Sequence, residues 1–536
     1  MIQKNTENKR RKVDLIMKRG TIKNWMAALL CVFLITGILS GCRNSAEKPS
    51  NDDSTALLTT EETEGTDSNN DSEETGLDYV ELVWHGSQMV SKDNEKVQEK
   101  INEYLREKLN CTFKFVTGDD SNIDQKFSVI LASGEQSDIM WTSNHRNDTF
   151  ANISKGAFLP LNDLLKQYAP TMYEAIPEYV WNSVTVNGSI YAVPGYLPYT
   201  MQPTLLLNKD IVDSVGYDMS QVDTIMDLEP LFDKILEKYP DKICVDASQG
   251  WLVSYATAGV FDRIEKYSTV GINVDDPNAK VTTQYLSEFG QEIFKLAERW
   301  YEAGYFDPNV NAVQDSSGDR KNQKVVGWFQ HIAYDGYGSD LVKGNMGFEM
   351  YEVPCTNEPP LVATTTVCGS MHAIPISSKN PERAMMVMEL IFTDKYLQDL
   401  FAYGIEGEHF NYTDDGKVVK TESGMNGYKE LAAVKNIKVQ SVLDNYPDNY
   451  VELVEAYNDS ARPSPLIGFT YDSADTSPLL ASVKSVWDEY FVTLACGMVD
   501  YDTVYPQFAA KMEQAGIDEL IADVQRQVDE FLKTKR

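Results

Sequence analysis

Downstream of residue 77, the spacing of apolar positions switches regularly between that of strands and that of helices. Two segments, 94–110 and 124–135, carry apolar residues at helical spacing, and the second contains Gly134 as a stop signal. Short apolar runs predict buried strands before, between and after them, at 79–84, 111–116 and 138–142. The order strand, helix, strand, helix, strand is typical of a parallel sheet with helices on both faces.

Further along the chain, the same spacing predicts three more local structures. Asn187-Gly188 is a hairpin-like turn that leads into a strand ending near 195. The segment 204–218 predicts a strand, a turn and a helix, and 324–338 predicts a strand followed by a glycine-rich turn. The body of the chain therefore has α/β character, and no period typical of solenoid repeats is visible in it.

An apolar run near the N-terminus, residues 25–38, has about fourteen residues, fewer than the ~20 that a helix needs to span a bilayer. Eight basic and two acidic residues precede it up to Lys23, which is the pattern of a secretory signal peptide. The letters "LSGC" ending at Cys42 resemble the lipobox of bacterial lipoproteins. The resemblance implies a signal peptide at 1–41 and a diacylated Cys42. A small-residue cleavage site with a chance cysteine is the alternative.

Residues 42–77 predict a flexible acidic tether. After Cys42 this segment has no aromatic residue and carries ten acidic against two basic residues. It therefore cannot bury enough apolar surface to offset the entropy lost on ordering. Because two acyl chains give stable attachment to a membrane, we expect a globular body held at the outer face of a bacterial membrane.

The composition limits the classes of function. The chain carries a net charge of −33, and so acidic a surface repels phosphate backbones, which argues against a nucleic-acid partner. The body, residues 78–536, is too long for one core and suits two lobes. Its five cysteines are widely spaced, which argues against a disulfide framework and against a CxxC metal site.

Several segments of the body occur in an order and spacing that resemble a known family. These segments are "GAFLPLNDLLKQYAP", "GSIYAVPG", "LLLNKDIVDSVG", "WYEAGYFDPN", "SSKNPERAMMVMEL", "YGIEGEHFNYTDDG", "SPLIGFTYD" and "AGIDELIADVQRQVDEF". The family is that of the extracellular solute-binding proteins of ABC importers, in its lipoprotein branch with a C-terminal domain of the DUF3502 kind. The resemblance implies a two-lobed α/β fold, the type II periplasmic-binding-protein fold of the maltose-binding-protein kind, with the ligand in an interlobe cleft.

The resemblance also implies where the chain passes between the two lobes. Crossings are expected near 194–204, near 364–374 and at least once after 403. The implied lobes are 78–198 plus 370–440 for lobe one and 199–369 plus 441–536 for lobe two, with a DUF3502-like region at about 400–536. Two rigid lobes that close around a hinge can bury a solute between them.

The aromatic content favours a carbohydrate as the solute. The chain has 8 Trp, 29 Tyr and 20 Phe, and the apolar C–H faces of sugars stack on flat rings with polar groups at the rim. Our first hypothesis is therefore an oligosaccharide that is handed to ABC permease subunits. A peptide or another small hydrophilic solute in the same fold is the alternative, although the predicted cleft segments contain almost no basic residue.

Ligand contacts are expected where parallel strands end, because loops at that edge of an α/β sheet form binding crevices. Trp84 ends the first predicted strand, and Trp141 and Thr142 end the third. Tyr196 and Tyr199 lie in the first expected crossing, which borders the cleft. Core packing at a strand end is the alternative for both tryptophans.

Lobe two supplies a second group of candidates. Trp251 opens a predicted helix, whose first N–H groups are free to bind ligand oxygens. A buried contact at the helix entry is the alternative for this residue. By the resemblance, the segment 324–338 brings aromatic residues into the cleft, so that Trp328, Tyr334 and Asp335 are candidates.

Three candidates lie nearer the C-terminus. Tyr403 and Glu406 belong to a glycine-rich turn for which we favour a structural role, with ligand contact as the alternative. Tyr471 is a further candidate in "GFTYD".

No motif of a familiar enzyme class is present. The sequence has no HExxH, GxSxG or P-loop pattern, and its 81 acidic residues make chance carboxylate pairs unavoidable. Its five histidines lack metal-ligand spacing. We expect a monomeric binding protein without cofactor or metal, and a surface glycoside-processing enzyme is the less favoured alternative.

Overall fold

The computed structural model describes residues 76–87, 91–117, 122–200, 202–264, 270–431 and 434–535. The predicted signal peptide, Cys42 and nearly all of the predicted tether lie outside these residues. Within the described ranges, no helix is both long enough and apolar enough to cross a membrane.

The first sheet is built mainly from the N-terminal part of the body. Its strands, in spatial order, are β2 (Cys111–Thr117), β1 (Val80–Gly86), β3 (Ile139–Thr142), β15 (Met371–Ala373) and β6 (Ala192–Pro194). β1 runs parallel to β2 and β3, as predicted, whereas β15 runs antiparallel to β3 and β6. The sheet is therefore mixed, because a strand from much later in the chain enters it in the opposite direction.

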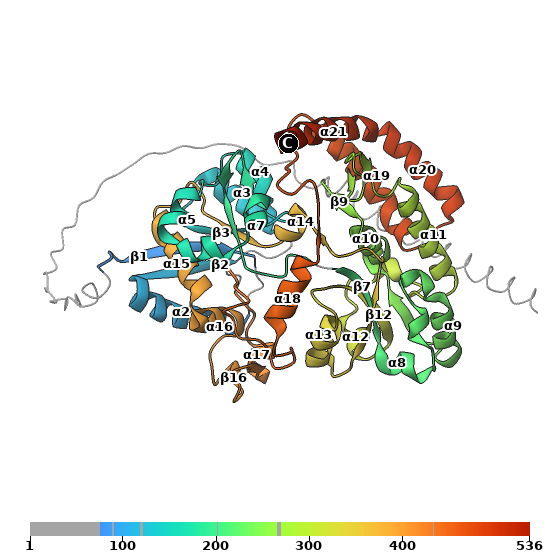
Figure 1. Ribbon diagram of the computed structural model, residues 1–536, viewed down its shortest axis with the longest axis horizontal. Coiled ribbons are helices and arrows are strands. Elements are labelled where there is room, and N and C mark those ends of the chain that lie inside the picture. The colour runs from blue at the N-terminus through green and yellow to red at the C-terminus, as the bar shows by residue number, and fades with distance from the viewer. Residues whose placement is uncertain are drawn as a thin grey trace, which may run out of the picture. The chain divides into compact units, whose positions relative to one another are not determined.

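The helices between these strands are α2 (Asn94–Leu109) and α3 (Ile123–Ser133), and both confirm the predicted helical spacing. The buried face of α2, at four-residue spacing, is formed by Val97, Ile101 and Leu105. α3 ends at Gly134 with a φ of 69°, a conformation that favours glycine. α15 (Pro381–Thr393) packs against α2, and Figure 1 shows this orange helix beside the blue strands.

The second sheet comes from the middle of the chain. Its strands, in spatial order, are β13 (Met350–Pro354), β7 (Gln202–Asn208), β12 (Val325–Ile332) and β8 (Ile243–Asp246). β7 is buried along its whole length and runs antiparallel to β12 and β13, and β12 runs parallel to β8. The strand and the helix predicted in 204–218 are confirmed as β7 and α8 (Lys209–Ser214).

Helices cover both faces of the second sheet. On one face, α9 (Glu229–Lys238), α10 (Trp251–Ala258) and α11 (Glu288–Glu302) share a core with Leu205 and Phe329. On the other face, α13 (Tyr337–Met346) packs against Leu206 and Trp328. Successive residues of β7 therefore serve two different cores, as strand geometry requires.

Three C-terminal helices extend the larger of these two cores. They are α19 (Ser477–Ala495), α20 (Tyr501–Gln514) and α21 (Ile517–Thr534), drawn in red in Figure 1. Val483, Phe508 and Val524, one from each helix, are fully buried in the core that also contains α10 and α11.

Two chain segments, 195–201 and 355–370, connect the sheets. A third segment runs beside them and consists of α18 (Tyr450–Asp459) and β18 (Arg462–Pro463), which pairs with β14 (Leu361–Val362). Val454 of α18 belongs to the core of the first sheet. The strands and cores do not define where one lobe ends and the other begins within the crossing segments. The predicted lobe boundaries therefore stay predictions.

The predicted hairpin at Asn187-Gly188 and a second hairpin are present. β4 (Thr185–Val186) and β5 (Ser189–Ile190) flank the Asn187-Gly188 turn, in which both residues have positive φ. β16 (Phe410–Tyr412) and β17 (Val418–Lys420) form the second hairpin. The five described cysteines are free and buried.

Candidate ligand-binding site

The two segments that connect the sheets lie at the edge of each sheet where its parallel strands have their carboxyl ends. The segment 195–201 leaves β6 at its carboxyl end and enters β7 at Gln202, which pairs with Ile332 at the end of β12. The segment 355–370 leaves β13 and enters β15 at Met371, which pairs with Thr142 at the end of β3. Because ligands of α/β sheets bind outside the carboxyl ends of strands, the candidate site lies along these joined edges.

One face of α10 lines this edge of the second sheet. Trp251, Ser254 and Tyr255 retain exposed surface, while Leu252 and Val253 between them are buried. Trp251 is 40% exposed. The helix ends at Gly259, where an added Cβ would lie 2.9 Å from Thr356 Oγ1 of the second crossing. α10 therefore runs from the end of β8 to the crossing segments.

His331 of β12 extends this aromatic face. Its ring stacks on Tyr255 with centroids 4.6 Å apart and 26° between the planes, and Tyr255 meets Trp251 edge to face at 5.7 Å. Burial, together with the nearby positive charge of Arg263, lowers the pKa of His331 to about 4. The imidazole is therefore neutral at physiological pH. We call Trp251, Ser254, Tyr255 and His331 the α10 face.

Further candidates lie at the end of β3 in the first sheet. Trp141 is 94% buried, and its Nε1 donates to Ser370 Oγ at 2.9 Å. The exposed ring of His145 stands edge to face against Trp141 at 6.0 Å. The Asn144 amide donates to the carbonyl of Thr365 at 2.9 Å. These contacts hold the loop after β3 against the end of the second crossing.

Trp84 and Thr142 occupy core positions instead. The Trp84 ring has no exposed surface and touches four aromatic rings, those of Phe113, Phe115, His372 and Phe401. The buried Thr142 hydroxyl donates to the Asn147 carbonyl and pairs with Thr149. Both surroundings favour a structural role, since no ligand can reach these groups past their neighbours.

The two crossing tyrosines are largely buried and engaged within the protein. Tyr196 donates to Glu455 Oε1 at 2.7 Å, and the Lys438 ammonium lies 4.5 Å from its ring centroid. Tyr199 donates to the Gly195 carbonyl at 2.8 Å. Their contacts tie the first crossing to its own segment and to α18.

The candidates from 324–338 have different surroundings. Trp328 is buried beneath the Arg320 guanidinium, which lies 5.3 Å from its ring and forms an ion pair with Asp246 at 2.6 Å. Tyr334 is buried and donates to Asp340 at 2.9 Å. Asp335 is exposed in the turn after β12 and therefore remains accessible to a solute.

The last three candidates lie in the C-terminal half. Tyr403 is buried and donates to the Ser441 carbonyl at 2.6 Å, whereas Glu406 is exposed in the following turn. Tyr471 donates to Asp523 of α21 at 3.1 Å, within the C-terminal helical region. These partners favour structural roles for both tyrosines.

The sequence matches the family described as bacterial extracellular solute-binding protein over residues 90–397. The chain belongs to this family. Residues 465–533 match the domain of unknown function DUF3502, so both parts of the predicted family assignment are confirmed.

Two curated relatives agree with this assignment. The solute-binding protein is 28% identical, over 77% of its own length and 83% of the relative, to a "Carbohydrate ABC transporter substrate-binding protein" of Streptococcus pneumoniae. It is 22% identical, over 55% of its length and 61% of the relative, to "Lipoprotein LipO" of Bacillus subtilis.

Solved structures resemble this solute-binding protein in fold. An N-glycan transport solute-binding protein of Streptococcus pneumoniae has a TM-score of 0.76 at 23% identity, covering 85% of this chain and 100% of that one. An alginate-binding protein, AlgQ2, has a TM-score of 0.60 at 17% identity, covering 85% and 98%. These likenesses confirm the predicted two-lobed α/β fold.

Sequence patterns missed three members of the α10 face of this solute-binding protein, Ser254, Tyr255 and His331. Tyr255 follows Trp251 at helical spacing on the exposed side, a signal that the sequence does contain. His331 carries no such signal, because it meets Tyr255 only when α10 packs on β12.

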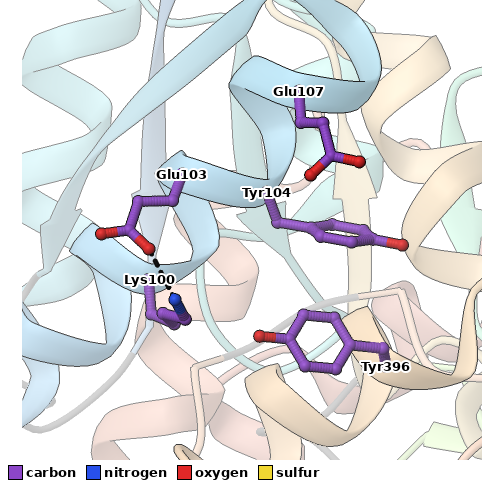
Figure 2. A pocket seen from close by; sticks show the side chains of 5 residues that line it. All are labelled: Lys100, Glu103, Tyr104, Glu107 and Tyr396. Atoms are coloured by element: carbon purple, nitrogen blue, oxygen red, sulfur yellow. Dashed lines mark hydrogen bonds and ion pairs between the residues drawn. The ribbon is translucent and has the colours of Figure 1, made fainter.

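A separate hollow of about 290 Å³ lies between α2 and α16 (Lys395–Tyr403). Figure 2 shows its side chains, with the Lys100–Glu103 ion pair beside two tyrosine rings. The lining residues are Lys100, Glu103, Tyr104, Glu107 and Tyr396. The hollow lies on the later turns of α2, which lead away from the carboxyl ends of the strands. No group of residues suited to hold a metal occurs in the part of the chain that the structure describes.

Proposed function

We propose that this solute-binding protein captures a carbohydrate, most simply a neutral oligosaccharide, and delivers it to the permease of an ABC transporter. The printed name of its 28% identical relative, a carbohydrate ABC transporter substrate-binding protein, supports the solute class and the transporter. The N-glycan transport protein of the same fold has been crystallised with Man1GlcNAc and with Man5GlcNAc, which supports an oligosaccharide.

The α10 face is the observation that carries the proposal. Trp251 offers an exposed flat ring, Tyr255 continues the surface, and the neutral imidazole of His331 can donate or accept a hydrogen bond without a net charge. Aromatic rings beside uncharged polar groups suit the apolar faces and hydroxyl edges of a sugar. Trp141, with Ser370 and His145, is the proposed contact from the first sheet.

In the proposed function, transport depends on closure of the lobes about the hinge, and the solute undergoes no reaction. Closure of two lobes around a hinge would bury the sugar and change the surface that the permease meets. The binding role requires no bond to be broken, so the solute should leave the protein unchanged. We propose that the protein acts as a monomer.

We propose that a lipid on Cys42 attaches the protein to the membrane. A diacylated Cys42 followed by the acidic tether would hold the lobes outside the cell and close to the permease. The printed name of the lipoprotein relative supports this arrangement.

The test is a binding panel with the processed chain, residues 42–536. Isothermal titration calorimetry would compare neutral oligosaccharides of glucose, mannose and N-acetylglucosamine with an oligosaccharide of uronic acids and with short peptides. We expect saturable binding of a neutral oligosaccharide, recovered intact by mass spectrometry. Binding of peptides alone would show that the solute is a peptide and not a carbohydrate. A cleaved oligosaccharide would show that the protein is an enzyme.

A further inference from the structure

We propose that the C-terminal helical region, residues 465–533, positions the solute-binding surface by holding the loop before Trp251. This inference rests on the proposed function, since it assigns the α10 face to the solute. The inference depends on the contact of α19 with η3 (Ser248–Gly250), the turn that joins β8 to α10. The region would then be part of the binding machinery, although it supplies no group to the solute.

The close approach of α19 to Gly250 is the first observation. A Cβ on Gly250 would lie 2.7 Å from Ala495 Cβ and 3.0 Å from Cε1 of Phe491. Gly250 also has a φ of 75°, in the region that favours glycine. The Gly250 backbone therefore packs directly on the side chains of Ala495 and Phe491, and Trp251 follows immediately as the first residue of α10.

A second contact holds the other end of the same loop. The thiol of Cys496, just after α19, lies 3.5 Å from the carbonyl of Ala247 and can donate to it. Burial raises the pKa of Cys496 to about 11, so the proton stays on the sulfur at physiological pH. The end of α19 thus touches the loop on both sides of Gln249.

The loop itself has a conformation that needs outside support. Gln249 has a φ of 59°, so two successive residues, Gln249 and Gly250, lie in the left-handed region. Such a conformation in a residue other than glycine persists only when the surroundings determine it. The Gln249 amide donates to the Val313 carbonyl at 3.2 Å, and Ser248 donates to Asp246 at 2.6 Å. α19 supplies the close contact at Gly250.

α19 is rigid enough to act as that support. Phe491 stacks on Trp487 with centroids 3.8 Å apart and 14° between the planes, and both rings pack on Tyr285. Just after the helix, a Cβ on Gly497 would lie 2.1 Å from the carbonyl oxygen of Ala297 in α11. The helix is thereby fixed to the lobe before it reaches the loop.

The test compares two phenylalanines of the same region. Phe491 touches Gly250, whereas Phe508 of α20 is buried in the same core away from the loop and packs on Tyr490 and Tyr505. Phe491→Ala, the milder Phe491→Leu and the control Phe508→Ala are made in the processed chain. Calorimetry with the best-binding oligosaccharide of the panel measures affinity. Hydrogen–deuterium exchange without solute measures the opening of residues 247–252.

We expect Phe491→Ala to weaken binding at least tenfold and to speed amide exchange in 247–252 at least tenfold. Phe491→Leu should show smaller changes in the same direction, and it replaces Phe491→Ala if that variant does not fold. Phe508→Ala should lower the melting temperature to a similar degree while affinity stays within twofold and exchange in 247–252 is unchanged.

Equal affinity losses in the Phe491 and Phe508 variants, or unchanged loop exchange in the Phe491 variants, would overturn the inference. Faster exchange with unchanged affinity would also overturn it, because the loop would then not control the solute surface. If the wild-type protein binds no oligosaccharide, the proposed function fails, and with it the assignment of the surface. The exchange comparison would still decide whether α19 holds the loop.

Discussion

At the scale of single residues, two tryptophans that the sequence names as candidates have opposite environments. Trp84 lies near the end of β1 and has no exposed surface, whereas Trp251 follows β8 and is 40% exposed. In the sequence, Trp84 ends a predicted strand and Trp251 opens a predicted helix. The difference arises from their neighbours, because four aromatic rings enclose Trp84 and the start of a helix holds Trp251 at the surface.

Alanine at these two positions should therefore separate binding from stability. We expect Trp251→Ala to weaken oligosaccharide binding tenfold or more, about 1.4 kcal/mol, with little change in melting temperature. We expect Trp84→Ala to lower the free energy of unfolding by about 3–5 kcal/mol, because it leaves a cavity in a packed core. Calorimetry and urea unfolding measure the two effects. Unchanged affinity in Trp251→Ala would remove this residue from the proposed site.

Asp262 supplies a prediction about pH. Its carboxylate is buried and accepts a hydrogen bond from Ser464 at 2.5 Å, and burial raises its pKa from 3.8 to about 6. Between pH 3.8 and about 6, Asp262 loses its proton in the unfolded chain but keeps it in the folded protein. The free energy of unfolding of the wild type therefore falls as the pH rises through this range. The contribution lost by pH 7 is about 3 kcal/mol.

Asp262→Asn should remove this contribution, since an amide does not ionise. Urea unfolding at pH 4, 5, 6 and 7 should show wild-type stability falling relative to the variant across this range, and levelling above about pH 6. A constant difference between the two proteins would show that the folded carboxyl titrates at its ordinary pKa.

At the scale of elements, α18 and β18 brace both crossing segments. The Asn458 side chain accepts from the backbone N–H groups of Tyr199 at 3.0 Å and Thr200 at 3.2 Å. Arg462 donates to the Pro359 carbonyl at 3.2 Å and to the Gly259 carbonyl at 2.8 Å. One short segment therefore hydrogen-bonds to the first crossing, the second crossing and the end of α10.

Asn458→Ala should destabilise the protein by about 1–3 kcal/mol, because two backbone N–H groups lose their acceptor. Asn345→Ala is the matched control, since this exposed asparagine bonds only to the Leu341 carbonyl of its own helix and should change stability by less than about 0.5 kcal/mol. Chemical unfolding of both variants measures the difference. Equal losses would mean that the Asn458 contacts add nothing specific to the crossing.

At the scale of the whole molecule, the proposed lipid anchor and the acidic charge act together. A net charge of −33 makes the protein repel other anionic surfaces, so electrostatic attraction cannot keep it at an anionic membrane. Attachment would then depend on acyl chains, of which a single one gives only marginal binding.

Cys42→Ser should therefore release the protein from the membrane. We expect the variant to lose labelling by a palmitate analogue and to move from the membrane fraction to the medium or wash. Cys31→Ser, in the apolar run that precedes it, is the control and should remain labelled and attached. Membrane retention of Cys42→Ser together with labelling would place the anchor elsewhere.

The sequence alone determined the order of β1, α2, β2, α3 and β3, the Asn187-Gly188 hairpin turn and the family. These features depend on local spacing of apolar residues and on turn residues such as Asn187-Gly188, which act within a few residues. The amphipathic face of α2 is an example, because its buried residues recur every fourth position. The segment 371–373 shows the limit, since three residues carry no period that predicts a strand.

Only the tertiary structure decided which predicted site residues are exposed and which are enclosed. It placed β15 antiparallel beside β3, enclosed Trp84 in aromatic rings and left Trp251 accessible. It also brought His331 onto Tyr255, although 76 positions separate them in the chain. Exposure depends on what packs over a side chain, and that packing joins segments far apart in sequence. Local patterns can therefore name candidates for a binding surface, and packing between distant segments decides which of them are exposed.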